Sequence, residues 1–310
     1  MTIDMSKISK KLQRILTESG WSQEVLAGKL GVSFVTLNSW VNGRSEPRKK
    51  ILPEIESLYF DIVGMDDITA DSIVTLKERA MKKHCSVQKI LKSRQLLEKL
   101  TVSLTYHTNA TEGSTMSEKD VAKVVLDNKV LRNRTAVEQR EAVNHQQALY
   151  FLLDMMAEQG KDFVVTPELI KLTHLRLMGG VISDAGCFRK HRVRIRGSFV
   201  PLANPLKVPE LIEDWCKMVN RSDEDKIELL ARSHAEFERI HPFSDGNGRT
   251  GRLMLFVLAL KAGLMPPILR KERRSAYYKY LEIAQTRENS VSLQKFIAEE
   301  ILATAEMAKM

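Results

Sequence analysis

The sequence predicts an all-α protein in which a small helix-turn-helix domain precedes a larger helical core with a short β-hairpin. Three observations lead to this class. Apolar residues recur at the three- and four-residue spacing of amphipathic helices. Long stretches such as residues 69–111 contain neither Gly nor Pro. One segment, residues 186–205, instead alternates with the period of two that is typical of a strand.

The composition is that of a globular protein with a basic surface. The 310 residues are 43% hydrophobic and 28% charged, so a substantial core is expected. An excess of 48 Lys and Arg over 39 Asp and Glu gives a net charge of +9. This balance favours acidic partners such as nucleic acid or nucleotide phosphates, although a basic surface that only aids solubility has the same composition.

The cysteines and the hydropathy indicate a cytoplasmic protein. The three cysteines are odd in number and widely spaced, which favours neither a disulfide framework nor a cysteine zinc site. No run of 18 or more apolar residues occurs, and residues 1–10 lack the apolar region of a secretion signal. We therefore expect a reducing compartment and no membrane partner.

Residues 1–65 are predicted to form the helix-turn-helix domain. A one-sided apolar stripe over residues 8–17 predicts the first helix. Ser22 can cap a short second helix, Gly31 ends it, and Ser33 caps the third. Pro47 and the basic residues after it end this module, and the apolar segment that follows closes its core before a boundary near residue 65.

Residues 66–160 are expected to form a helical connecting region. Residues 69–111 predict a pair of helices or one long helix. A further helical block covers residues 117–159, with a break near residues 129–135. The region also contains a short motif at residues 108–113.

The core is assigned to residues 161–310. Its first helix begins at Thr166 or Pro167 and ends at Met178, before two glycines. The hairpin of residues 186–205 comes next, and helices resume at about Pro209. Ser222 or Asp223 caps a helix that ends at Ile240, because Pro242 follows. A nearly all-apolar helix over residues 250–263 must be buried, and it is too short to span a membrane.

The stretch "IHPFSDGNGRTGRL", residues 240–253, predicts a phosphate site. Its glycines let the backbone approach a ligand at the start of the buried helix, where free N–H groups and the helix dipole favour an anion. Arg249 and Arg252 both reach that helix end and suit phosphate oxygens. An acidic Asp245 beside them is tolerable if it holds a divalent metal ion that bridges phosphates. His241 can take a proton from an incoming hydroxyl.

A glycine-rich turn with incidental charges would account for each of these residues singly, but it does not account for the combination. The stretch is not a Walker A loop, because no Lys-Ser/Thr follows the glycines. His234 suggests a metal site, but the sequence around it is not HExxH, and we expect a hydrogen-bonded core residue.

"HPFSDGNGRTGR" resembles the Fic-family motif, His-x-Phe-x-Asp/Glu-Gly-Asn-Gly-Arg-x-x-Arg, at every fixed position. The resemblance covers roughly residues 100 to 310 and implies a helical enzyme that transfers AMP from ATP to a hydroxyl of Tyr, Thr or Ser in a target protein. It implies that His241 is the general base, that Asp245 binds Mg²⁺, and that residues 193–199 form a flap that aligns the target by strand addition. The ATP-binding residues would be Gly246, Asn247, Gly248, Arg249, Thr250, Gly251 and Arg252.

"TNATEG", residues 108–113, is similar to the inhibitory-helix motif of Fic proteins, Ser/Thr-x-x-x-Glu-Gly/Asn. The resemblance implies that Glu112 pairs with Arg252 and denies that partner to the γ-phosphate of ATP. Without the catalytic motif, a capped helix end would explain these six residues as well. The same glutamate could position water for the removal of AMP, and the sequence does not separate the two directions.

Residues 20–47 resemble the Cro and phage-repressor helix-turn-helix family, with apolar residues where its core lies. In that docking mode the helix from Ser33 to Val41 enters the DNA major groove. A module used only for protein contact or dimerisation is the alternative. Oligomeric state is left open, although repressor-type modules often bind DNA as homodimers. Gln23, Ser33, Phe34, Thr36 and Asn38 would face the DNA, and Arg44, Lys49 and Lys50 would meet phosphates.

The leading hypothesis is thus a protein adenylyltransferase restrained by Glu112 and joined to a DNA-binding domain. One alternative is a Doc-like kinase, against which Gly248 and Arg249 argue, because that family usually carries a bulkier residue and a lysine there. The second alternative is a transcriptional regulator whose Fic domain only senses nucleotide. The sequence names neither the target protein nor the operator.

Overall fold

The computed structural model describes residues 5–63, 70–195, 200–221, 225–287 and 289–309. The chain divides into two compact units, residues 1–70 and residues 71–310. Within the described residues the secondary structure is helical, as expected. None of the helices in these ranges has the length and apolar character needed to cross a membrane.

The first unit is a four-helix module whose caps are set by local sequence. It contains α1 (Met5–Ser19), α2 (Gln23–Lys29), α3 (Phe34–Val41) and α4 (Leu52–Val63). The hydroxyls of Ser22 and Ser33 accept the backbone N–H groups of Val25 and Thr36, as predicted. The core joins all four helices, and its fully buried side chains include Leu12, Ile15, Leu26, Leu37 and Ile55.

The second unit begins with five helices. These are α5 (Ala70–Met81), α6 (Val87–Lys92), α7 (Arg94–Thr111), α8 (Glu118–Val125) and α9 (Ala136–Gln159). The prediction of one or two helices over residues 69–111 was wrong, because Ser86 and Ser93 each cap a new helix there. The predicted break before α9 is confirmed, and Thr135 caps that helix.

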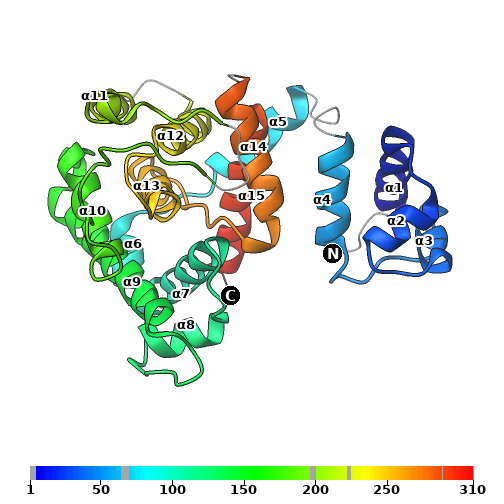
Figure 1. The fold of residues 1–310 in the computed structure, drawn as a ribbon, viewed down its shortest axis with the longest axis horizontal. Coiled ribbons are helices and arrows are strands. Elements are labelled where there is room, and N and C mark those ends of the chain that lie inside the picture. Colours follow the sequence, from blue (N-terminus) through cyan, green and yellow to red (C-terminus); the bar gives the residue numbers. More distant parts are fainter. Residues whose placement is uncertain (1–4, 64–69, 196–199, 222–224, 288, 310) are drawn as a thin grey trace. The chain divides into compact units, whose positions relative to one another are not determined.

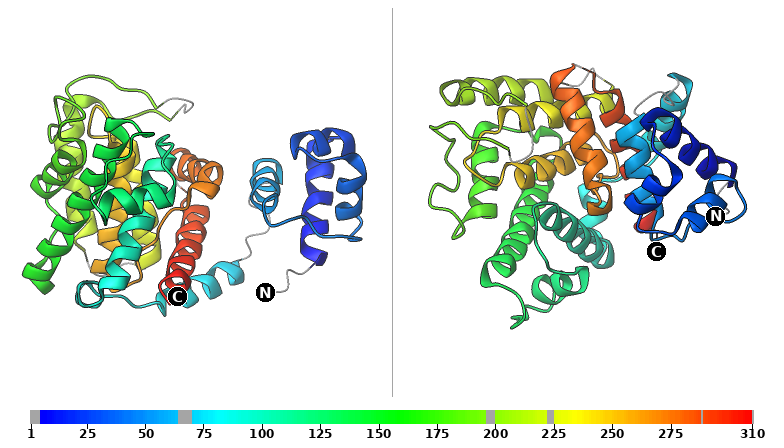
Figure 2. Two further views of the ribbon diagram at one scale, coloured as in Figure 1. Left: turned by 90° about the horizontal axis from the view of Figure 1, so that it is seen from below. Right: turned by 45° about the vertical axis from the view of Figure 1, so that its right-hand side comes forward.

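Within the described residues, six further helices complete the second unit. They are α10 (Pro167–Met178), α11 (Val208–Val219), α12 (Lys226–Ile240), α13 (Asn247–Lys261), α14 (Arg274–Thr286) and α15 (Val291–Met307), with short 3-10 turns at Gly160–Asp162, Pro205–Lys207 and Lys271–Arg273. In Figure 1, α12 lies on one side of α13, and α7 and α9 lie on the other. Figure 2 shows α14 and α15, orange and red, side by side. Contacts from four helices explain why residues 253–260 of α13 are all buried.

Two predictions around α12 and the hairpin need correction. Asp225 caps α12, because its carboxylate accepts the N–H groups of Ile227 and Glu228, while Ser222 and Asp223 lie outside the described residues. The expected hairpin is not seen, since residues 186–195 and 200–204 form no strand and residues 196–199 lie outside the described ranges.

Buried Arg189 explains how this segment is held without a strand ladder. Its guanidinium donates to the carbonyl oxygens of Ala203 at 2.6 Å, His241 at 2.7 Å and His191 at 2.9 Å. Among the described residues, this segment is therefore held by hydrogen bonds from a side chain to backbone carbonyls and not by strand pairing. A two-stranded ribbon alone would be only marginally stable.

Candidate active site

His241 ends α12 in a conformation that presents its ring to a cavity. It has the left-handed backbone angles φ 50° and ψ 63°, and its N–H donates to the carbonyl oxygen of Phe237. Its Nδ1 lies 3.1 Å from the carbonyl oxygen of Glu238. A carbonyl only accepts, so Nδ1 carries the proton and Nε2 keeps a lone pair. Burial lowers the pKa of His241 to about 4, so the ring is neutral at pH 7.

The loop that follows is shaped by two side chains that the sequence had assigned to ATP. Asn247 accepts the N–H of Phe243 at 2.8 Å and donates to its carbonyl at 2.9 Å. The Thr250 hydroxyl donates to the carbonyl of Gly246 at 2.9 Å. Both side chains are buried, and both form their hydrogen bonds with backbone groups of the loop. They fix its shape, and the backbone of the loop is what a ligand would meet.

At two positions of this loop the surrounding atoms leave no room for a Cβ, so only glycine fits. Gly246 has φ 76°, and a Cβ there would lie 2.7 Å from Met178. A Cβ on Gly248 would lie 3.0 Å from Nη1 of Arg252 and closer still to the carboxylate of Glu112. Gly246 precedes α13 without a side-chain cap, so the first N–H groups of a fifteen-residue helix face the cavity. This is the geometry of an anion site.

Both arginines of the motif lie at this helix end and are paired with carboxylates. Arg249 is 7% exposed and binds Glu141 of α9 at 2.5 Å. Asp245 is farther from it, at 3.7 Å. Arg252 is 2% exposed and pairs with Glu112. Glu141 was not anticipated, because the contact joins residues 108 positions apart and no local signal marks it.

Glu112 caps the C-terminus of α7, and the expected contact with Arg252 is present. The same guanidinium nitrogen lies 3.4 Å from the carbonyl of Thr108. Burial alone would raise the pKa of Glu112, but the charge and hydrogen bond of Arg252, together with the charges of Arg249 and Arg274, outweigh it and the net shift is downward. The carboxylate of Glu112 therefore stays ionised and pairs with the guanidinium of Arg252 at the cavity.

The start of α13, His241 and the pair of Glu112 and Arg252 line a cavity of 560 Å³, and residues of α14 supply another part of its wall. Tyr278 and Leu281 supply an aromatic and apolar surface, and Arg274 adds a charge. Val193 and Ile195 of the arginine-rich segment also border it. The sequence did not assign α14 to the site, because its residues reach the cavity only through tertiary packing. A wall of this kind suits a planar base beside a phosphate-binding helix end.

Asp245 fits a metal ion only as part of a larger ligand set. Its side chain is 64% exposed and open to the cavity. Its Oδ1 accepts the N–H of Gly246 at 2.6 Å, which leaves the second carboxylate oxygen available. Among the described residues, no three His, Cys, Asp or Glu side chains gather as a metal site. A single carboxylate suits an ion such as Mg²⁺ that is held largely by phosphate oxygens and water.

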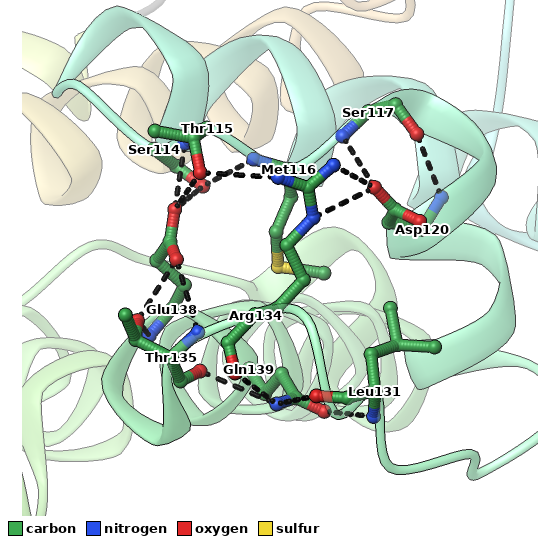
Figure 3. Close-up of polar contacts among 10 residues, drawn as sticks. All are labelled: Ser114, Thr115, Met116, Ser117, Asp120, Leu131, Arg134, Thr135, Glu138 and Gln139. Atoms are coloured by element: carbon green, nitrogen blue, oxygen red, sulfur yellow. Dashed lines mark hydrogen bonds and ion pairs between the residues drawn. The ribbon is translucent and has the colours of Figure 1, made fainter.

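A polar collar fixes the turn after Glu112, and Figure 3 shows its members. We define the collar as Ser114, Thr115, Ser117, Asp120, Arg134, Thr135 and Glu138. Glu138 accepts the N–H of Thr115 at 2.6 Å and its hydroxyl at 2.8 Å, while its second oxygen accepts from Thr135. Arg134 donates to Asp120 at 2.6 Å. The hydrogen bond from the Thr115 backbone is the main reason that the pKa of Glu138 falls to about 2.

His234 is a core residue, as expected. Its Nε2 lies 2.8 Å from the hydroxyl of Tyr277, and both side chains are buried. Burial lowers the pKa of His234 to about 3. It is therefore a neutral ring, hydrogen-bonded to a tyrosine that lines the cavity.

In the first unit, the residues predicted to meet DNA lie together on α2 and α3. Asn38 donates to Gln23 at 3.0 Å, which ties the two helices to each other. Ser33 and Thr36 share a 2.8 Å hydrogen bond at the start of α3. Phe34 is 43% exposed and Val35 75% exposed, so α3 begins with an apolar surface. Arg44, Lys49 and Lys50 follow α3 in the sequence, and all three are exposed.

Two segments of the chain match known protein families. The Fic/DOC family model matches residues 164–259, and a helix-turn-helix model matches residues 12–60. Protein adenylyltransferase fic-1 of Caenorhabditis elegans is 30% identical over 194 residues, which are 62% of this chain and 38% of that protein. Protein adenylyltransferase Fic of Drosophila willistoni is 30% identical over 229 residues, 70% of this chain and 45% of that one.

Solved structures share the fold. A fragment of Fic-1 from C. elegans superposes with a TM-score of 0.65 at 22% identity, covering 92% of this chain and 84% of that one. A Fic domain containing signaling protein from Bacteroides thetaiotaomicron gives 0.61 at 18% identity, covering 77% and 97%. The chain spans less than half the length of the two sequence relatives. It carries a Fic/DOC-family domain at residues 164–259, preceded by a helix-turn-helix domain at residues 12–60.

Proposed function

We propose that this chain is a protein adenylyltransferase that transfers AMP from ATP to a hydroxyl side chain of a target protein. One observation carries the proposal. The neutral His241, the open N-terminus of α13 and the buried Arg252 lie at one 560 Å³ cavity, and the buried Arg249 lies on the first turn of the same helix. The relatives named protein adenylyltransferase support the same assignment.

In this proposal the phosphates of ATP bind at the start of α13. The backbone N–H groups after Gly246 hold them, Arg249 and Arg252 neutralise the outer oxygens, and Tyr278 and Leu281 border the base. Asp245 would hold Mg²⁺, which supplies positive charge to the α- and β-phosphates when bound. This arrangement turns the α-phosphorus toward the side of the cavity that contains His241.

The transfer then needs a base that takes the hydroxyl proton and a route by which the target hydroxyl reaches the α-phosphorus. The target hydroxyl oxygen bonds to the α-phosphorus, the bond from that phosphorus to the β-phosphate oxygen breaks, and pyrophosphate leaves. The hydroxyl proton passes to Nε2 of His241, whose Nδ1 proton is held by the carbonyl of Glu238. The segment with Val193 and Ile195 borders the cavity and is the proposed site of target alignment.

Glu112 is proposed to restrain this reaction. Its carboxylate occupies Arg252 and lies against Gly248, where an outer phosphate would sit. ATP must displace it to bind in line with the incoming hydroxyl. The same carboxylate beside the cavity could hold water for the reverse reaction, so removal of AMP is part of the proposal.

The first unit is proposed to bind DNA through residues 20–50. The exposed start of α3 and its basic flank support major-groove docking. The cytoplasm is the proposed compartment, because all three cysteines are free. Binding as a homodimer is proposed by analogy with repressor modules alone.

Labelled ATP separates the candidate functions. Wild type and Glu112→Gly are incubated with ATP labelled at the α- or the γ-phosphate, in the presence of Mg²⁺ and a cell lysate. We expect protein-bound α label, stronger with Glu112→Gly. Protein-bound γ label would instead mean a kinase. Absence of both labels from protein would indicate a transcriptional regulator whose Fic domain only senses nucleotide.

A further inference from the structure

A buried carboxyl group lies beside His241 at the cavity and has no role in the mechanism so far. Glu238 occupies the last turn of α12 and is 4% exposed. Its Oε2 is 3.8 Å from Nδ1 of His241. Within the described chain, its Oε1 has no hydrogen-bond partner. A Cβ on Gly251 would come within 2.5 Å of Oε1, so the carboxyl lies against the backbone of α13.

An unpaired buried carboxyl is costly, and burial raises the pKa of Glu238 to about 7. An amide would fill the same volume without a charge, so packing alone does not require a glutamate. The titratable and charged groups around Glu238 are Glu112 on α7, Arg252 on α13, the hydroxyls of Tyr277 and Tyr278 on α14, and His241 at the end of its own helix.

We propose that Glu238 is a positioning residue for the transfer, whose carboxylate stabilises the imidazolium that His241 becomes when it accepts the hydroxyl proton. The proposal rests on the adenylyltransferase function above. Its basis is the 3.8 Å separation, the burial of both groups and the unpartnered Oε1.

The proton balance is simple. The proton of the target hydroxyl moves to Nε2, and the Nδ1 proton stays on the ring, hydrogen-bonded to the carbonyl of Glu238. The ring gains one positive charge, which the nearby carboxylate offsets in a medium of low dielectric. After pyrophosphate leaves, the Nε2 proton is released to solvent and the ring is neutral again. Glu238 itself exchanges no proton with the substrate.

The test compares Glu238→Gln with Glu236→Gln, both in the Glu112→Gly background. Glu236 is two residues away on α12 and pairs with Arg239, so it is a matched control. We expect Glu238→Gln to lower kcat by about tenfold or more, with the KM for ATP within about twofold of the parent. The control should match the parent in both constants.

The pH profile provides a readout that a structural role would not move. In the parent, kcat should rise as pH increases through the range near 7 in which Glu238 ionises, because the carboxylate is the active form. Glu112→Gly removes a nearby negative charge, so this rise should be centred lower than in the presence of Glu112. In Glu238→Gln the rise should disappear. Its melting temperature at pH 8 should be at least that of the parent, since a buried charge is lost.

Three results would overturn the proposal. One is a kcat and pH profile of Glu238→Gln equal to those of the parent. Another is a lower kcat that comes with a lower melting temperature and an unchanged profile, which would mean a packing role. The third is a parent whose kcat does not vary between about pH 6 and 8.5. If the parent transfers no AMP at all, the proposed function fails instead.

Discussion

Replacement of Glu112 by glycine should release the enzyme by an amount that can be worked from the ion pair it makes. Loss of one partner from a buried pair typically costs about 3–5 kcal/mol. Arg252 is 2% exposed but the side chain of Glu112 is 33% exposed, so we take a lower figure of about 2–3 kcal/mol. ATP no longer has to displace that pair, and at about 1.4 kcal/mol per tenfold the rate should rise about 30- to 150-fold.

The assay is the initial rate of protein-bound α label at limiting ATP, for wild type, Glu112→Gly and Glu112→Gln. The glutamine keeps an acceptor but loses the charge, so its rate should lie between those of wild type and the glycine variant. Glycine should also lower the melting temperature, because Arg252 becomes an unpaired buried charge. ATP should restore more stability to the variant than to wild type. Equal rates in wild type and Glu112→Gly, at limiting and saturating ATP, would refute the competition for Arg252.

The same site makes three further outcomes testable. His241→Ala in the Glu112→Gly background should abolish transfer and leave the Kd for ATP within about twofold, because the ring acts on the hydroxyl proton and not on the phosphates; a large loss of ATP binding in calorimetry would contradict this. Glu138→Gln should loosen the collar and raise the wild-type rate by about three- to tenfold, from the loss of charge-assisted bonds worth about 1 kcal/mol, with no effect once Glu112 is glycine; an equal gain in both backgrounds would show that the collar does not act through Glu112. For stability, the pKa of Glu238 is raised from 4.5 to about 7, so the folded state holds this proton while the unfolded state has lost it, and stability falls as pH rises between those values. Glu238→Gln should flatten that part of the curve by up to about 3 kcal/mol in chemical denaturation, and an unchanged curve would argue against the shift.

Features set by neighbouring residues were predictable from the sequence. The caps of α2 and α3, the start of α10 at Pro167 and the end of α12 at Ile240 each depend on a few adjacent residues. The phosphate-binding character of the α13 N-terminus is equally local, since it needs only glycines before a helix. The inhibitory role of Glu112 was predicted from the family resemblance, because the six residues of its motif alone could not distinguish an inhibitory helix from a capped helix end.

Features set by tertiary packing were not predictable. Glu141 reaches Arg249 across 108 positions, and Tyr278 borders the cavity from a helix with no motif of its own. The alternation that favoured a hairpin belongs to a segment next to the buried Arg189, whose hydrogen-bond partners lie up to 52 positions away. Asn247 was expected to touch the ligand, yet its side chain is used to hold Phe243. In these cases the deciding contact is made by side chains whose partners the local pattern does not reveal.

The most direct test of AMP transfer restrained by Glu112 is mass spectrometry of proteins from cells that express Glu112→Gly. We expect peptides that carry an adenylyl group on Tyr, Thr or Ser. These should be absent from cells with the Glu112→Gly and His241→Ala double variant, and scarce with wild type. Phosphoryl groups in their place, or adenylyl groups at equal abundance without His241, would contradict the proposed function.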